Sequence, residues 1–180
     1  MRPFNQSLPM PTRRAETESW PDPGPSAAAL QLERFLPYRL SLIASLVSQA
    51  LSQIYAERYG IGVPEWRVLA TLGQYDSLTG KQIGTHSHMH KTKVSRAVAL
   101  LERRKLVARR PNREDMREAF LSLTPAGRAI YDDLAPVALA FEQKLIAGVD
   151  GDELALLGRV LTKLTERAKQ MAADASDGPG

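Results

Sequence analysis

Apolar residues recur at helical spacing near both ends of the chain. From about Glu33 or Pro37 to Arg58, the sequence predicts one long helix that stops before Gly60. Its apolar residues form two faces, with Leu40, Ile43, Val47, Ala50 and Ile54 on one and Leu42, Leu46 and Leu51 on the other. A helix that is apolar nearly all round must be buried on several sides, which favours a subunit interface as well as an internal core.

Two further helices are predicted after residue 124. Thr124 followed by Pro125 is a typical helix start, and Pro136 inside the same helix predicts a kink. Asp150 and Glu153 form a capping pattern before the last helix. The apolar residues of the two helices recur at helical spacing: Ile130, Leu134, Val137, Phe141 and Leu145, then Leu154, Leu157, Leu161 and Leu164. These faces and the first helix can be buried against a second copy, so we predict a homodimer.

Shorter patterns fill the middle of the chain. Pro64 begins a helix with apolar residues available for packing, namely Trp66, Leu69, Ala70 and Leu72. Thr79 and Gln82 have the spacing of a capping box, which predicts a short helix from about Gly80 to the region of His86–His88. The next helix begins near His90 or Lys91, and its apolar face consists of Val94, Ala97, Val98 and Leu101.

A hairpin is predicted directly after these helices. Its first strand begins at Leu106 and Val107, and its second strand consists of residues 119–123, where apolar and polar residues alternate. Its turn is rich in residues that suit a reversal: Pro111, Asn112, Glu114 and Asp115. Two helices with a hairpin behind them make a winged helix-turn-helix. The expected fold class is mainly α with a small β-wing (α+β), in which N- and C-terminal dimerisation helices flank this head.

This organisation divides the chain into parts with different roles. Residues 1–29 hold six of the twelve prolines and few large apolar residues, so we expect a disordered N-terminal arm. Residues 30–60 and 125–172 form the helical dimerisation region, and residues 61–124 form the winged helix-turn-helix domain. Residues 173–180 are small and polar and are expected to form a flexible tail.

Charge is concentrated in the predicted head. Residues 78–128 contain twelve Lys or Arg against four acids, a net charge of +8. The whole chain carries only +4, so the remainder carries −4. Basic charge gathered in about a quarter of a sequence is typical of a surface that binds a polyanion. We therefore expect double-stranded DNA as a partner.

The predicted DNA contacts lie on the helices of the head and on the hairpin. Polar side chains at the start of a groove-entering helix can reach base edges and phosphates, and arginines of a hairpin can enter the minor groove. The expected DNA-binding residues are Thr79, Gln82, Lys91, Thr92, Lys93, Ser95, Arg96, Arg103, Arg110, Arg113 and Arg117. Asp115 is expected to structure the wing by holding Arg117 or capping the turn, because a carboxylate facing DNA phosphate would be repulsive.

Other function classes have less support in the sequence. No glycine-rich phosphate loop, nucleophile elbow or pair of catalytic carboxylates is present, so we expect neither an enzyme nor a cofactor. The chain has no cysteine and no run of about 18 apolar residues that could cross a bilayer. Because an apolar signal core is also lacking, we expect a cytoplasmic protein without a membrane partner.

Three histidines leave one alternative open, a metal-responsive regulator that uses His86, His88 and His90. Their spacing places the middle histidine roughly opposite the other two on a helix. A turn could bring the three together, but no carboxylate or cysteine lies close in sequence to complete a site. We therefore expect no metal site.

The stretch from Leu78 to Tyr131 resembles the MarR family of bacterial transcriptional regulators. Two motifs carry the resemblance: KTKVSR at residues 91–96, and DMR at residues 115–117 followed by LTPAG at residues 123–127. It covers roughly residues 36–169 and implies a homodimer with interlocking terminal helices, a palindromic operator, and repression relieved by a small molecule. Residue by residue, it also places four positions on the recognition helix, namely Thr92, Lys93, Ser95 and Arg96. Arg113 falls at the wing tip, and Asp115 and Arg117 fall on the wing's motif pair.

Two departures from the family pattern concern the turn before the recognition helix. His88 stands where these proteins often have a glycine, and His90 stands where a capping aspartate is usual. Histidine tolerates a positive φ better than most residues do. The geometry of this turn is therefore a specific question for the structure.

Within the family, residues 35–51 and 62–72 look most like regulators of aromatic-acid catabolism. This resemblance implies a small aromatic acid or its CoA thioester as effector, bound between the dimer helices and the head. Arg39 would pair with a carboxylate or phosphate as a two-pronged donor, and Tyr38 and Trp66 would line an aromatic slot. The alternative is a DNA-binding regulator without a small-molecule effector.

Overall fold

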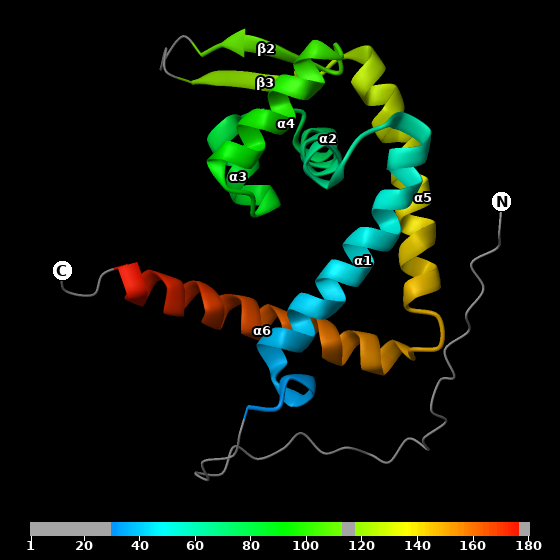
Figure 1. Ribbon diagram of the computed structural model, residues 1–180, viewed down its shortest axis with the longest axis vertical. Coiled ribbons are helices and arrows are strands. Elements are labelled where there is room, and N and C mark those ends of the chain that lie inside the picture. Colours follow the sequence, from blue (N-terminus) through cyan, green and yellow to red (C-terminus); the bar gives the residue numbers. More distant parts are fainter. Residues whose placement is uncertain (1–29, 113–117, 177–180) are drawn as a thin grey trace, which may run out of the picture. The chain divides into compact units, whose positions relative to one another are not determined.

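The computed structural model describes residues 30–112 and 118–176 and shows helices with one small sheet (Figure 1). A short 3₁₀ helix, Leu32–Arg34, is followed by six α-helices: α1 (Leu36–Tyr59), α2 (Val63–Tyr75), α3 (Gly80–Ser87), α4 (Lys91–Arg103), α5 (Pro125–Leu145) and α6 (Gly151–Ser176). The strands are β1 (Ser77–Thr79), β2 (Val107–Pro111) and β3 (Ala119–Leu123). The expected fold class, mainly α with a winged helix-turn-helix, is confirmed.

The chain divides into two units inside α1, after Val47. In the first unit, the described residues are the 3₁₀ helix and the beginning of α1. The apolar side chains of Leu42, Ile43 and Leu46 are 44–56% exposed there. The second unit begins at Ser48 and contains the end of α1, the head, α5 and α6.

Side-chain caps start three of the helices where the sequence predicts them. Thr124 Oγ1 accepts a hydrogen bond from the Gly127 N–H at the start of α5, at 3.1 Å. Asp150 and Glu153 exchange side-chain and backbone hydrogen bonds of 2.8 and 3.0 Å at the start of α6. Thr79 and Gln82 form the corresponding capping box of α3. Such caps satisfy N–H groups that lack an acceptor in the first turn.

Two helices extend through positions where the sequence predicts an interruption. Pro136 lies inside α5, which continues to Leu145, and the kink expected there stays a prediction. α6 continues to Ser176, so residues 173–176, which we expected to belong to a flexible tail, are helical. Alanine at positions 172, 173 and 175 accounts for this extension, because alanine has the highest helix propensity.

The sheet has three antiparallel strands in the order β1-β3-β2. β1 was not expected from the sequence, and it pairs Leu78 with Leu121 of β3. Pro111, which the sequence analysis placed in the turn, is the last residue of β2 and lies opposite Ala119. β2 is an edge strand, where a proline without an N–H is tolerated.

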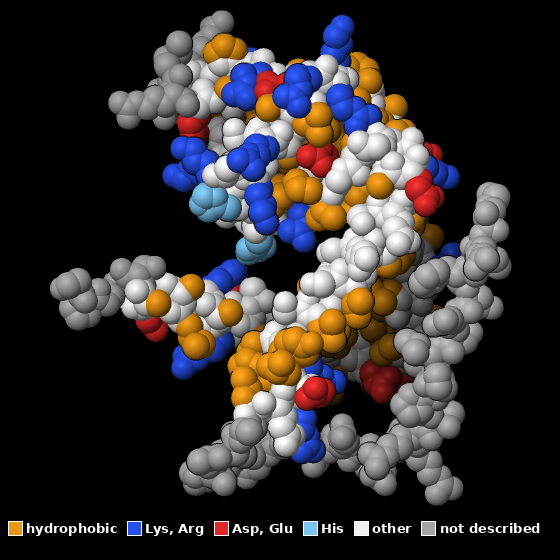
Figure 2. Space-filling model, in the orientation of Figure 1, with side chains coloured by type: hydrophobic (Ala, Val, Ile, Leu, Met, Phe, Trp, Pro, Cys, Tyr) orange, Lys and Arg blue, Asp and Glu red, His pale blue; other side chains and the backbone are white. Residues whose placement is uncertain are grey.

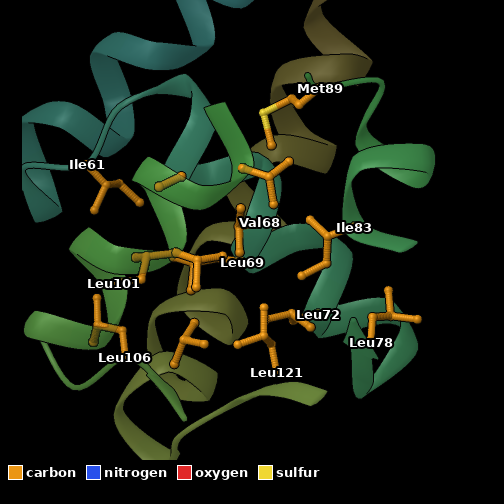
Figure 3. Packing of buried hydrophobic residues seen from close by; sticks show 14 of the residues in the cluster. Ile61, Val68, Leu69, Leu72, Leu78, Ile83, Met89, Leu101, Leu106 and Leu121 are labelled. Atoms are coloured by element: carbon orange, nitrogen blue, oxygen red, sulfur yellow. The ribbon is translucent and has the colours of Figure 1, made fainter. Parts of the chain in front are cut away.

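The core of the second unit lies among α2, α3, α4 and the sheet (Figure 3). Its most deeply buried side chains include Val68, Leu69 and Leu72 of α2, Ile83 of α3 and Leu101 of α4. Other parts of the chain also contribute buried side chains to this core: Tyr55 of α1, Ile61, Leu121 of β3 and Leu134 of α5. The helices of the head are therefore held against the hairpin by shared apolar packing.

α6 differs from the helices of the head in its exposure. Its apolar residues Leu156, Leu157, Val160 and Leu161 are 41–54% exposed. None of the helices in the described part of the chain is long and apolar enough to cross a lipid bilayer.

Candidate nucleic-acid interface

The start of α3 is held by a reciprocal cap. Thr79 Oγ1 accepts the Gln82 N–H at 3.3 Å, and Gln82 Oε1 accepts the Thr79 N–H at 2.8 Å. Thr79 is buried, whereas Gln82 and its neighbour Lys81 are exposed. The two capping side chains thus fix the first turn of α3, and the DNA contacts expected of them stay predictions.

Two histidines build the turn between α3 and α4. His88 has φ 51° and ψ 39°, the left-handed conformation that ends α3. His90 precedes α4 in an extended conformation, and its Nδ1 accepts the Thr92 N–H at 3.3 Å. Between them, Met89 is buried, and its N–H donates to Gly84 O at 3.1 Å. Both departures from the family pattern therefore keep the geometry of a helix-turn-helix.

α4 separates its residues into a buried and an exposed face. Val94, Ala97, Val98 and Leu101 are at most 2% exposed and contribute to the core. The residues predicted to meet DNA are all exposed: Lys91, Thr92, Lys93, Ser95, Arg96 and Arg103. Figure 2 shows Lys, Arg and His side chains gathered over α3, α4 and the strands.

Ala99 is exposed on the same helix, and the sequence analysis did not single it out. Residues three or four apart lie on one face of a helix, so Ala99 continues the stripe of Thr92, Ser95, Arg96 and Arg103. A methyl group at this place can contact a thymine methyl group in the major groove. Only the helical spacing could have indicated it, because alanine has no polar group that draws attention.

The hairpin is tied to the end of α4 by an ion pair. Arg109 Nε donates to Glu102 Oε1 at 2.8 Å, and Arg109 Nη2 donates to Glu102 Oε2 at 3.0 Å. The hydrogen bonds from Arg109 lower the pKa of Glu102 and raise the pKa of Arg109 itself. Arg109 therefore holds β2 against α4, a role that the sequence did not reveal.

Of the three hairpin arginines expected to contact DNA, Arg110 is the one that lies among the described residues. It is exposed, and its guanidinium lies 6.0 Å from the centroid of the Phe120 ring, which faces it across the strands. A ring below the guanidinium restricts the arginine without removing its charge. Arg113, Asp115 and Arg117 lie outside the described residues.

A cavity of about 750 Å³ lies between α3, α4 and the sheet. Its lining combines exposed cationic side chains with buried apolar ones. The lining includes Lys81, Lys91 and Glu118 together with the buried side chains of Met89, Val94 and Leu121. The two lysines would attract a negatively charged group on this side of the head, and the carboxylate of Glu118 would repel it.

The residues expected to bind an effector belong to different units. Tyr38 and Arg39 are exposed in the first unit. Trp66 is half-buried in the second unit, where its ring stacks on Tyr55 and on Tyr131, with centroids 5.8 and 6.5 Å away. Trp66 therefore packs α2 against α1 and α5, which agrees with the packing role expected from the sequence. Its contact with an effector stays a prediction.

The three histidines have separate local roles. His86 stacks on Tyr75, with ring centroids 4.3 Å apart, while His88 and His90 form the turn described above. Among residues 30–112 and 118–176, no group of His, Asp and Glu is arranged to hold a metal ion.

Similarity to known proteins agrees with this geometry. A sequence model described as MarR family matches residues 59–118. The uncharacterized HTH-type transcriptional regulator YwoH of Bacillus subtilis (strain 168) is 28% identical over 116 residues, which are 64% of this chain and 83% of that protein. A MarR family transcriptional regulator from Silicibacter pomeroyi is 31% identical, with a TM-score of 0.66 over 76% of this chain and 91% of that chain.

A likeness of fold extends to a solved protein–DNA complex. MepR of S. aureus, whose structure contains DNA, has a TM-score of 0.68 with this chain. The two share 24% sequence identity, and the match covers 74% of this chain and 98% of MepR.

Proposed function

Because the chain belongs to the MarR family, it is a DNA-binding transcriptional regulator and not an enzyme, and we propose that it acts as a homodimeric repressor. In this proposal, a small aromatic acid or its CoA thioester releases the protein from a palindromic operator. The alternatives are a regulator without a small-molecule effector and a metal-responsive regulator that uses His86, His88 and His90.

The exposed face of α4 carries the proposal for DNA recognition. Its exposed polar and basic residues stand opposite a face that is fixed in the core, so they can enter a groove without disturbing the fold. We place α4 in the major groove and the hairpin, with Arg110, at the adjacent minor groove. Contacts by Arg113 and Arg117, and the structuring role of Asp115, stay predictions from the sequence.

Exposed apolar side chains support the proposed homodimer. Leu42, Ile43 and Leu46 are exposed on α1, and Leu157 and Leu161 are exposed on α6. Soluble monomers rarely leave apolar residues in such continuous stretches open to water. A second copy of the chain would cover these faces, and two-fold symmetry would then match two half-sites about 34 Å apart on DNA.

Light scattering tests the dimer directly. We expect the mass of two chains for the wild-type protein and the mass of one chain after Leu157→Lys with Leu161→Lys. The matched control is Lys163→Glu, which changes charge on the same helix without touching its exposed leucines. A monomeric wild-type protein would contradict the proposed dimer.

Release by an effector requires a difference in affinity between two states. In one conformation of the dimer the two recognition helices are spaced to fit the operator, and in the other they are not. The effector must bind the second conformation more tightly than the first. We assign Arg39 to the carboxylate or phosphate of the effector and Tyr38 and Trp66 to its ring. This assignment comes from the sequence resemblance, and the guanidinium's two-pronged geometry is what suits it to such an anion.

The effector experiment uses fluorescence anisotropy of the protein on DNA from its own promoter region. Aromatic acids and then their CoA thioesters are titrated into the complex, and release by one class identifies the effector chemistry. Arg39→Ala should abolish release and leave DNA affinity nearly unchanged, while the matched control Arg34→Ala should behave as wild type.

Each other outcome has a definite meaning. Release that persists in Arg39→Ala would remove Arg39 from the effector site. A complex that neither class releases would favour a regulator without an effector of this kind. Release by Zn²⁺ alone, lost in a His86→Ala and His90→Ala double variant, would favour the metal-responsive alternative.

A further inference from the structure

The turn that ends the recognition helix is also the place where α5 begins. Lys105 O accepts the Thr124 hydroxyl at 2.7 Å, and Leu106 O accepts the Thr124 N–H at 3.0 Å. Gly127, in the first turn of α5, approaches Leu106 O so closely that a Cβ on it would collide with this oxygen. The start of α5 is thus fixed to the backbone just after α4.

The same turn reaches the end of α1 through one side chain. Arg104 follows α4 directly, and its guanidinium donates to Tyr59 O at 2.7 Å and to Gly60 O at 3.2 Å. Carbonyls at a helix C-terminus lack partners within the helix and lie at its negative end, so they favour a cationic donor. Arg104 therefore caps α1 from a position 44 residues further along the chain.

These two carbonyls lie where α1 is joined to α2. Only residues 60–62 separate the two helices, and Gly60 ends α1 with φ +58°. A glycine in this conformation permits a sharp change of chain direction and resists bending less than other residues do. The guanidinium of Arg104 binds the carbonyl oxygens of two successive peptide groups at this point, Tyr59–Gly60 and Gly60–Ile61.

The end of α1 is further linked to α5. Arg58 Nη1 and the Tyr59 hydroxyl each donate to Asp133 Oδ2 at 2.8 Å. The last turn of α1 is therefore in contact with α5 on one side and with the turn after α4 on the other. Both helices that lead away from the head meet the recognition helix at its C-terminal end.

Apolar packing secures this junction independently of Arg104. Ile61, Leu101 and Leu106 are at most 5% exposed and belong to one core cluster. Arg104 and its two hydrogen bonds are exposed to solvent. Exposed polar contacts contribute little to folding stability, so loss of the two bonds should leave the head folded.

We propose that Arg104 is a positioning residue, which sets the orientation of the recognition helix relative to the end of α1. The proposal rests on the proposed function, because orientation matters only if two heads of a dimer bind one operator. When one head has bound, the second binds as an intramolecular event that succeeds only if the two helices have the correct spacing. Arg104 thus contributes to operator affinity without touching DNA.

The test compares a full operator with a single half-site for Arg104→Ala. We expect affinity for the full operator to fall about tenfold, within the usual range for coupling between sites, and affinity for the half-site to change less than about twofold. Duplexes with one base pair added or removed between the half-sites give a second readout. Wild type should discriminate strongly against them, and Arg104→Ala should discriminate less.

Two variants separate positioning from charge. Arg103→Ala removes the exposed arginine at the end of α4, an expected DNA contact, so it should weaken half-site binding clearly and weaken full-operator binding by about the square of that factor, because both heads lose the contact. Arg104→Lys keeps the charge but loses the two-pronged geometry, so it should remain impaired on the full operator. Full restoration by lysine would overturn the proposal in favour of a charge effect.

Other results would also overturn it. A clear loss of half-site affinity in Arg104→Ala, with the full operator weakened by about the square of that factor, would make Arg104 a DNA contact. A lower melting temperature with unchanged DNA binding would make its role purely structural. A wild-type protein that binds full operator no better than half-site would contradict the dimeric function itself, which distinguishes that failure from a failure of the positioning role.

Discussion

Arg109 of β2 and Glu102 of α4 form a two-pronged ion pair that fastens the hairpin to the recognition helix. The hydrogen bonds from Arg109 hold the pKa of Glu102 below its ordinary value of 4.5, although partial burial acts in the opposite direction. The hairpin therefore keeps its place beside α4 through a contact that requires an ionised carboxylate.

The ion pair should make stability depend on pH. Because the pKa of Glu102 is lower in the folded state, its contribution is present above the unfolded-state pKa and is lost as pH falls through the folded-state pKa. Glu102→Gln should lower the free energy of unfolding by about 0.5 kcal/mol at pH 7, as expected for a partly exposed pair. Urea denaturation at pH 7 and at about pH 3 checks this. An equal difference at both pH values would exclude the ion pair as its cause.

Lys105, the second residue after α4, has a backbone conformation that suits glycine better. Its φ is 58°, and the next N–H, that of Leu106, donates back to Leu101 O at 2.9 Å, as in a glycine-terminated helix. Lys105→Gly should raise the free energy of unfolding by about 0.5–1 kcal/mol, because a Cβ is unfavourable at this φ. Lys105→Ala keeps a Cβ and removes the charge, so it should give no gain in thermal denaturation. A gain of the same size with alanine would show that the lysine charge, not the backbone, is responsible.

Glu118 lines the cavity beside Lys81 and Lys91. Because it lies on the side that faces DNA in our proposal, its carboxylate should repel phosphates. Glu118→Gln should tighten binding to promoter DNA about two- to fivefold at low salt, and the gain should shrink as salt screens the charges. The control Asp132→Asn removes an acid on α5, which does not line the cavity, and should change affinity much less. A gain in DNA affinity that does not change with salt concentration would contradict this explanation.

Arg96 lies in the middle of the exposed stripe of α4. If it reads a base, Arg96→Ala should cost about 1–3 kcal/mol on promoter DNA and much less on random DNA. Anisotropy with both duplexes measures the difference. Equal weakening on both would assign Arg96 to a phosphate instead.

Local patterns predicted most of the helices because their causes are local. Capping pairs such as Thr79 with Gln82 and Asp150 with Glu153 involve residues three apart, and the buried face of α4 follows from helical spacing. β1 was missed, since a strand of three residues has too few positions for a recognisable pattern and is stabilised by pairing with β3.

The contacts that organise the interface join residues far apart in the chain, so no local sequence pattern indicates them. Arg104 binds Tyr59 and Gly60 more than 40 residues away, and Trp66 stacks on Tyr131 of a different helix. In the sequence, Arg103 and Arg104 look like one basic patch. In the structure, however, Arg104 donates hydrogen bonds to two carbonyl oxygens at the end of α1. The exposed stripe of α4 could be predicted, but the contacts that orient it could not.

The most direct test of the account is anisotropy of the wild-type protein on DNA from its own promoter region, measured at two salt concentrations and combined with the binding stoichiometry. We expect two chains per duplex and binding that weakens steeply with salt, because basic side chains of two heads release counterions from the phosphates. We also expect weaker binding when one half of the palindrome is scrambled. Binding that does not depend on salt, or no binding, would contradict the claim that the exposed face of α4 recognises DNA.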